Sequence, residues 1–333
     1  MIRLKSNQLV RFFLYLSGIF ALLSCGTYHK EPALEFQHAE DGAMAADISR
    51  DAKISVVSSI DLGLLVWDLE YNQKIYQWAY KGDGETINLV SMVRIANDNS
   101  YVVSADRDAF AIWSLNTGEP DGFWRIDEST IRDVAIADQG TTVLVGRSNG
   151  KVMMLEPFTG RRLEFLGHTE RINSVDISPN GYYALTGGND YVAYLWDTRT
   201  GQVVHRFDHP SRVTKVLIDP KGRYLFTADS QKTARIWDAQ TGEEVSRLQF
   251  IQRQMIFSSV VFSDDGSRLL TGSPNRLLAL WEVQSGNQIE GWRVRPNEKA
   301  VGNSAIVYGV GFYNENQVIS ESSSGWAEVW DVQ

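Results

Sequence analysis

The sequence predicts an all-β protein built from seven copies of one four-stranded unit, and three series of residues with a shared period support this prediction. The clearest copy runs from Leu163 to Gly201, with a Gly-His pair near its start and a Trp-Asp pair near its end. Four short apolar runs lie between turn residues in this stretch. Gly-His followed by Trp-Asp within ~40–45 residues is typical of one blade of a β-propeller, a ring of radial four-stranded sheets.

The first series consists of a Trp, or in one copy a Leu, followed by an acidic or polar residue. Its members are Trp67-Asp68, Trp113-Ser114, Leu155-Glu156, Trp196-Asp197, Trp237-Asp238, Trp281-Glu282 and Trp330-Asp331. Successive members are 46, 42, 41, 41, 44 and 49 residues apart. Each step is close to the length of one blade, so the series predicts seven blades.

Turn residues form the other two series. Asp, Asn, Pro and Gly recur where the first two strands of each copy should join, at residues 49–52, 97–99, 138–140, 178–181, 219–222, 263–266 and 314–316. Thr-Gly or Ser-Gly pairs follow five members of the first series, at Thr117-Gly118, Thr159-Gly160, Thr200-Gly201, Thr241-Gly242 and Ser285-Gly286. These residue types favour tight turns, so they mark the ends of the predicted strands.

On these residues the chain resembles the WD-repeat β-propellers over about residues 33–333. The copy from Leu163 to Gly201 fits the repeat well, whereas Leu155-Glu156 lacks the Trp and most copies lack the Gly-His pair. The resemblance implies a structural tetrad within one blade, formed by the hydrogen-bonded side chains of His168, Thr186, Asp190 and Trp196. A His, a hydroxyl and an Asp can also form a catalytic relay, but the spacing favours the structural tetrad.

The last blade is predicted to be completed by the beginning of the chain. An apolar residue 11 positions after the Trp should lie on each outermost strand, at Trp78, Trp124, Leu166, Phe207, Leu248 and Trp292. The seventh copy lacks this residue, because the sequence stops three residues after Trp330. Phe36-Gln37-His38 matches Phe207-Asp208-His209, so Ala33–Gln37 should pair as the missing strand, with Phe36 in the vacant core position. The alternative is a disordered leader, which would leave sheet edges open.

Residues 1–24 are predicted to be a lipoprotein signal peptide, followed by a short tether at 25–32. Three cations precede an apolar run at Phe12–Leu23, whose 12 residues suit a signal-peptide core and fall short of a membrane span. Leu22-Leu23-Ser24-Cys25 resembles a bacterial lipobox, which implies acylation at Cys25 after cleavage. Gly26 stands where an Asp would favour the inner membrane, so the outer membrane, facing the periplasm, is expected. An ordinary signal peptide or an uncleaved anchor is the alternative.

Composition and motifs argue against nucleic-acid binding, metal or cofactor binding, and catalysis. The net charge is −9, or −12 without the three cations of the signal peptide, and an acidic chain disfavours nucleic acid as a partner. The five His residues lack metal-ligand spacing, and Cys25 is the only cysteine. The sequence has no dinucleotide or phosphate-binding glycine motif and no Gly-x-Ser-x-Gly. We therefore expect no metal, no cofactor and no enzymatic activity.

The remaining candidate is a binding surface. The loops that lead into each blade, and the turns between second and third strands, should form a top face that carries Arg107, Arg147, Arg171, Tyr191, Arg212, Gln231 and Arg276. Arg is enriched at protein interfaces, so these residues are a candidate partner-binding patch, and a mixed, solvated face is the alternative. We expect a lipid-anchored scaffold that binds other envelope proteins. The alternative function is an enzymatic or small-ligand-binding propeller that uses the central channel, with polar groups such as Asp133 and Lys215.

Overall fold

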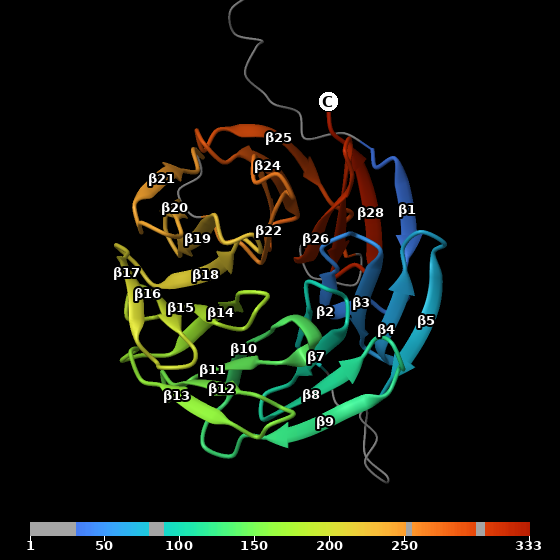
Figure 1. Cartoon of the computed structure of the whole chain (residues 1–333). Helices are drawn as coiled ribbons and strands as arrows, with labels where there is room; N and C mark the ends of the chain where they lie inside the picture. Colours follow the sequence, from blue (N-terminus) through green and yellow to red (C-terminus); the bar gives the residue numbers. More distant parts are fainter. Residues whose placement is uncertain (1–30, 80–89, 251–254, 298–303) are drawn as a thin grey trace, which may run out of the picture. The chain divides into compact units, whose positions relative to one another are not determined.

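The computed structural model describes residues 31–79, 90–250, 255–297 and 304–333. Within these residues, 28 strands form seven antiparallel sheets of four strands each, arranged as the blades of a ring (Figure 1). The predicted fold class is therefore confirmed. The predicted signal peptide, Cys25 and most of the tether lie outside the described residues, and Glu31–Gln333 forms one unit.

The blades are numbered along the chain, each from its innermost to its outermost strand. Blade 1 contains β2 (Ala43–Ile48), β3 (Ile54–Ser59), β4 (Gly63–Asp68) and β5 (Gln73–Trp78), and blade 2 contains β6 (Met92–Ile95), β7 (Tyr101–Ala105), β8 (Ala109–Ser114) and β9 (Pro120–Arg125). Blade 3 contains β10 (Ile131–Ile136), a 3-10 turn at Asp138–Gly140, β11 (Val143–Arg147), β12 (Val152–Leu155) and β13 (Arg162–Phe165). Blade 4 contains β14 (Ile172–Ile177), β15 (Tyr183–Gly188), β16 (Val192–Asp197) and β17 (Val203–Asp208).

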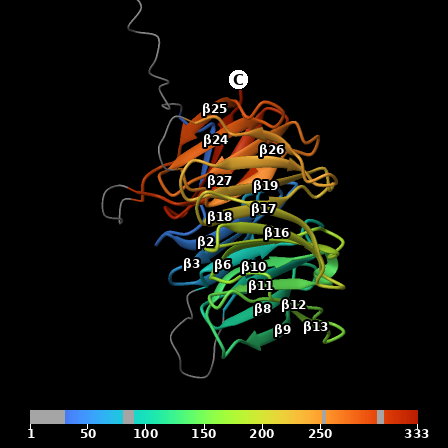
Figure 2. The same cartoon turned by 90° about the vertical axis from the view of Figure 1, so that its left-hand side faces the viewer.

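The other three blades follow the same order. Blade 5 contains β18 (Val213–Ile218), β19 (Tyr224–Asp229), β20 (Ala234–Asp238) and β21 (Glu244–Arg247), and blade 6 contains β22 (Ser259–Phe262), β23 (Arg268–Gly272), β24 (Leu277–Glu282) and β25 (Gln288–Arg293). Blade 7 contains β26 (Val307–Asn314), β27 (Gln317–Ser322), β28 (Trp326–Asp331) and, from the other end of the described chain, β1 (Leu34–Gln37). Figure 2 shows the ring from the side, with strands running between its two faces.

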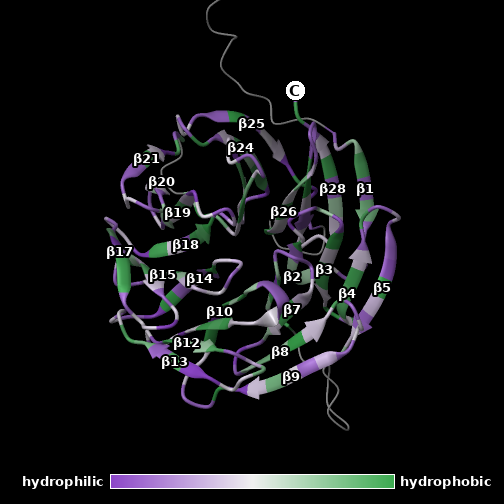
Figure 3. Ribbon diagram, in the orientation of Figure 1, coloured by the Kyte–Doolittle hydropathy of each residue, from purple (hydrophilic) through white to green (hydrophobic). Residues whose placement is uncertain are grey.

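The strands of blade 4 illustrate how the sequence produces a blade. Residues Val192–Trp196 of β16 are all buried, and so are five of the six residues of β15. Both faces of a blade pack against neighbouring blades, so its middle strands are apolar along their length instead of alternating. The outermost strand β17 buries only Phe207 fully. Figure 3 shows the same contrast in blade 1, where β4 is hydrophobic and the outermost strand β5 is mainly hydrophilic.

The ring closes as the sequence predicts. Strand β1 pairs with β28, and Phe36 lies opposite Ala327, three residues before Trp330. Phe207 lies opposite Ala193, three residues before Trp196, so both phenylalanines occupy the same register position. Phe36 is partly buried against apolar residues of blades 1 and 7. The strand at Leu34–Gln37 thus completes blade 7 and is not a disordered leader.

The prediction for the outermost strand of blade 3 is wrong by one residue. Phe165 lies opposite Val152 and is 4% exposed, whereas Leu166 is 67% exposed. In blade 4 the register shifts next to Trp196, because the outermost strand carries one extra residue. The hairpin of β12 and β13 has no such bulge, so its buried position comes one residue earlier.

Aromatic residues on outermost strands pack against the next blade. The rings of Trp78 and Trp113 stack at 4.9 Å, and those of Phe165 and Trp196 stack at 4.5 Å. Trp292 is fully buried in a cluster with Trp330. These contacts identify the regularly spaced aromatics as packing residues between blades. Among the described residues, no helix is long and apolar enough to cross a membrane.

Candidate functional site: the top face and the central channel

The predicted tetrad of blade 4 is only partly hydrogen-bonded. His168 Nδ1 lies 2.9 Å from Asp190 Oδ2, and His168 Nε2 lies 3.0 Å from Thr186 Oγ1. Burial opposes ionisation of Asp190, but its hydrogen bond to His168 and the charge of His168 hold the pKa of Asp190 below its ordinary value. Trp196 is fully buried, and its indole Nε1 has no hydrogen-bond partner among the described residues. Trp196 therefore acts by stacking on Phe165.

The tetrad does not have the geometry of an active site. Thr186 is 0% exposed and the His168 side chain is also inaccessible, so no substrate can reach the hydroxyl. Blade 5 repeats the arrangement, with Thr227 Oγ1 lying 2.8 Å from both His209 Nε2 and Trp237 Nε1. Asp229, 3.7 Å from His209, takes the acidic position there, and Gln231 is exposed. The repeated network supports the structural interpretation.

The predicted top-face patch is not continuous. Arg107, Arg212 and Gln231 are exposed, and Tyr191 is 52% exposed with a positive φ of 69°. Arg276 is half-buried, and its Nε donates a hydrogen bond to the carbonyl oxygen of Val294 at 2.8 Å. Arg276 is thus committed to the loop after blade 6.

Arg147 is a correction to the predicted patch. It is only 2% exposed, and its guanidinium contacts the carboxylates of Glu128, at 3.4 Å, and Glu164. Lys151 lies 3.3 Å from Glu164 and completes this cluster. An arginine so enclosed holds blade 3 together and is inaccessible to a partner. This burial could not be predicted from the sequence, because the acidic partners come from two other segments of the blade.

Sequence reasoning also missed Arg132 as a surface residue. Arg132 is exposed near the top end of β10, at a register shift between Ile131 and Asp133. Partial burial and then the charge of Arg171 lower the pKa of Arg132, and Asp133 opposes this shift. Arg132 on β10 and Arg171, which directly precedes β14, lie at the top ends of two innermost strands that pack against each other. The dipeptide Arg132-Asp133 was visible in the sequence, but the approach of Arg171 from blade 4 was not.

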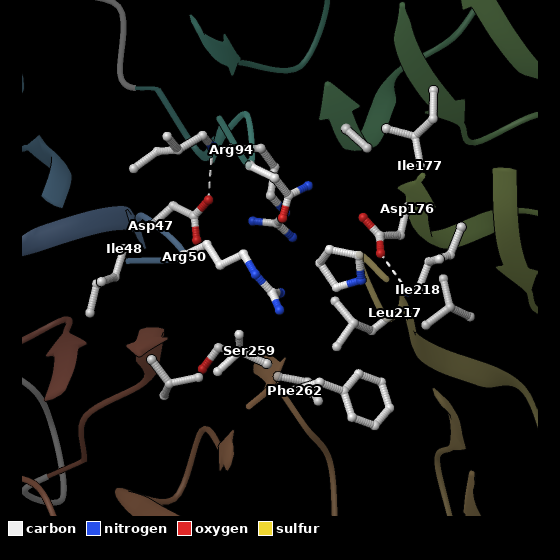
Figure 4. A pocket seen from close by; sticks show the side chains of 18 of the residues that line it. Asp47, Ile48, Arg50, Arg94, Asp176, Ile177, Leu217, Ile218, Ser259 and Phe262 are labelled. Atoms are coloured by element: carbon white, nitrogen blue, oxygen red, sulfur yellow. Dashed lines mark hydrogen bonds between the residues drawn. The ribbon is translucent and has the colours of Figure 1, made fainter. Parts of the chain in front are cut away.

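Charged side chains converge in the central channel. Its lower part contains a cavity of about 120 Å³, lined by residues of all seven innermost strands, including Asp47, Arg94, Asp176 and Lys215. Figure 4 shows Asp47 and Asp176 on opposite sides of this cavity, with Arg50 extending between them. Burial raises the pKa of Asp176 to about 6, while burial and the charge of Arg94 lower the pKa of Lys215 to about 8.

The channel carboxylates connect neighbouring blades. Asp47 accepts a hydrogen bond from the backbone N–H of Ile95 at 2.8 Å, and Asp176 accepts one from Ile218 at 2.6 Å. Asp133 does the same for Val175 at 3.0 Å and pairs with Arg94 at 3.1 Å. A buried carboxylate needs such partners. These residues fasten one innermost strand to the next, and the cations balance their charge.

Comparison with known proteins agrees with this architecture. Residues 160–197 and 201–238 match the WD40 family (WD domain, G-beta repeat). Each match begins at or before an outermost strand and ends at the third strand of the next blade, so the sequence repeat is offset from the blade by one strand. This offset explains why the first strand of the ring completes its last blade.

A curated relative gives a weaker likeness. Over 105 aligned residues the chain is 30% identical to pre-mRNA-splicing factor cwf17 of Schizosaccharomyces pombe. The aligned stretch covers 31% of this chain and 29% of that protein. The chain is a seven-bladed β-propeller that carries WD40 repeats. Propellers of this class generally act as protein-interaction scaffolds.

Proposed function

We propose that this protein is a lipid-anchored scaffold of the bacterial cell envelope, placed on the periplasmic side of the outer membrane, that binds other envelope proteins through its top face. The observation that carries the scaffold function is the division of the ring into two parts. His168 bonds to Thr186 inside blade 4, and the channel carboxylate of Asp176 bonds to the backbone of the next blade, whereas Tyr191, Arg212 and Gln231 are held exposed on top-face loops. Exposed loops on a rigid scaffold commonly carry binding residues, and the hydroxyl and His of the tetrad are inaccessible to a substrate.

Site-specific cross-linking tests the top face. The photoreactive residue p-benzoylphenylalanine replaces Arg212 on the top face or, as a matched control, Gln240 in an exposed turn of the bottom face. Specific protein adducts in cells are expected from position 212 and not from position 240. Equal capture from both positions, or none from position 212 in a folded and membrane-bound protein, would contradict the proposal.

The proposed anchor rests on Cys25 and on the position of β1. Strand β1 begins at Leu34 on the bottom face, where the turns between third and fourth strands also lie. Seven residues between Cys25 and Ala33 span at most roughly 25 Å when extended, so an anchor would keep the bottom face near the bilayer and leave the top face accessible. Replacing Cys25 with Ser should abolish incorporation of an alkyne-tagged fatty acid and release the protein from the membrane fraction. Unchanged labelling in this variant would refute the anchor.

The channel supports a second candidate, a small-ligand site. Lys215 lines the cavity and makes no hydrogen bond or ion pair with the described part of the chain. The bonds of Asp47, Asp133 and Asp176 to neighbouring blades favour the structural role for the cluster. A co-purified molecule, detected by mass spectrometry of the native protein and lost on substitution of Lys215 by Met, would favour the ligand site instead.

A further inference from the structure

The innermost strands of five blades carry a bulge at their top ends. The register of the first two strands skips one residue in blades 1, 3, 4, 5 and 7. The skipped residues are Met44, Arg132, Asn173, Thr214 and Tyr308. A bulge frees its residue from the sheet pairing and re-aims its side chain. Because the innermost strands line the channel, these residues surround its top mouth, and Arg132 is the charged one among them.

Arg132 and Arg171 are left unpaired at this mouth. Neither guanidinium forms an ion pair or a side-chain hydrogen bond with any residue that the structure describes, and Arg171 Nε is buried without a partner. Several other arginines pair with carboxylates, as in Arg161–Glu156, Arg199–Asp197 and Arg223–Asp219. Asp133, which follows Arg132 in the sequence, already pairs with Arg94 and accepts a hydrogen bond from the backbone of Val175.

Two neighbouring like charges without a counter-ion are unfavourable in the free protein. The cost is greater where one guanidinium is partly desolvated, as at Arg171. A carboxylate placed between the two would remove the repulsion and satisfy the buried N–H. Guanidinium groups suit this task because their planar donors match the two oxygens of a carboxylate.

We propose that Arg132 and Arg171 form a binding site for an acidic segment of a protein partner, with Asp or Glu side chains seated at the top mouth of the channel. This inference rests on the top-face scaffold proposed above and names the chemistry of its partner. The chain has a net charge of −9 overall, so an acidic partner is repelled from most of its surface. Complementary charge at one place therefore fixes where and in which orientation the partner docks.

Peptide binding by the full chain in lipid nanodiscs tests the site. The probe is fluorescein-labelled hexaglutamate, followed by anisotropy at low salt, with hexalysine and a phosphoserine peptide of the same length as comparisons. Replacing both Arg132 and Arg171 with Gln should weaken hexaglutamate binding roughly tenfold or more, because two charge-assisted contacts are lost. Replacing Lys221, an exposed bottom-face cation, with Gln is the matched control and should change it less than about twofold.

Several results would overturn the inference. These are no binding of hexaglutamate to the unmodified chain, equal binding to the double variant with its fold intact by circular dichroism, and tighter binding of the phosphoserine peptide. Cross-linking from position 212 separates this inference from the scaffold itself. Partner capture that persists in the double variant refutes the acidic site alone, whereas loss of capture only in the double variant supports it.

Discussion

His168, which leads from blade 3 into blade 4, and His38, which leads from blade 7 into blade 1, occupy the same repeat position but have different roles. In blade 4, His168 bonds Thr186 and Asp190 of its own blade. His38 follows β1 as His209 follows β17, but its Nδ1 lies 2.5 Å from Oε1 of Glu321, on β27 of blade 7. Ser55 of blade 1 donates a second hydrogen bond to the same oxygen at 2.7 Å. The histidine thus stabilises one blade in the first case and joins two blades in the second.

The difference follows from how the two blades are connected. All four strands of blade 4 are joined by turns, whereas β1 reaches blade 7 from the other end of the ring and has no turn to hold it beside β28. The closing seam, formed by β1, its partner β28 and the adjoining blade 1, therefore carries additional polar contacts. Arg295 lies 2.7 Å from Glu35 of β1 and 4.3 Å from the ring of Trp326 on β28. A seam without a covalent link needs side chains to fix it.

The largest expected effect comes from breaking the seam pair. Replacing Glu321 with Ala leaves His38 buried without its carboxylate and should destabilise the ring by about 3–5 kcal/mol. Replacing Asp190 with Ala in blade 4 removes a carboxylate whose side chain is 8% exposed, against 0% for Glu321, and leaves His168 bonded to Thr186, so we expect only about 1–3 kcal/mol. Chemical denaturation followed by tryptophan fluorescence measures both. A larger loss for Asp190 than for Glu321 would reverse the comparison.

Truncating the equivalent phenylalanines of the outermost strands should have the opposite ranking, with the larger loss of stability in blade 4 and the smaller loss in blade 7. Phe207 is 3% exposed, so its replacement with Ala should cost about 3–5 kcal/mol. Phe36 is only partly buried, so its replacement should cost about half as much. Hydrogen exchange should localise the second effect to β1 and β28. Global destabilisation by the Phe36 variant without faster exchange at β1 would contradict its role in closure.

The two blades should also respond oppositely to pH. Burial lowers the pKa of His38, but its ion pair and hydrogen bond with Glu321 outweigh burial and raise it above 6.5. The seam contribution is then complete below pH 6.5 and lost as pH rises through the higher folded value. Burial raises the pKa of Glu328 on β28 to about 7, with Glu35 adding and Arg295 and Arg276 opposing. The pKa of Glu328, like that of His38, is raised by folding, so its contribution to stability also decreases with rising pH. That contribution is lost between about pH 4.5 and 7.

In blade 4 the pKa of Asp190 is lowered, so its contribution is present above its ordinary value near 3.8 and is lost as pH falls. Hydrogen exchange, corrected for intrinsic rates, should show protection of β1 decreasing from pH 5 to 8.5 while that of β16 stays constant. Replacing His38 with Gln should flatten the β1 profile. An unchanged profile in that variant would assign the pH dependence to Glu328.

The smallest expected effect separates two tryptophans. Trp237 Nε1 donates to Thr227 at 2.8 Å, whereas Trp196 Nε1 has no partner in the described structure. Replacement with Phe removes similar packing at both positions. The loss of stability should therefore be larger for the Trp237 variant than for the Trp196 variant by about 1 kcal/mol, the value of one buried hydrogen bond. Equal losses in matched denaturation curves would mean that Trp196 is hydrogen-bonded in solution.

The number of blades, the turns between strands and the closing role of β1 could all be predicted from the residues along the chain. These depend on local causes, since turn residues and buried apolar positions recur at the period of the unit that needs them. Even the one-residue error at Leu166, where the buried position is Phe165, has a local cause. The β12–β13 hairpin lacks a bulge, and no residue type in the sequence indicates this.

Which charged side chains contact one another depends on the assembled ring. Asp47, Asp133, Asp176, Arg94 and Lys215 come from five blades and share one channel because the ring brings their strands together. The same holds for His38 with Glu321, 283 residues apart, and for Arg132 with Arg171. Burial of Arg147 likewise depends on what surrounds it. The physical reason is that period and turn chemistry act along the chain, whereas electrostatic partners are set by distances across space.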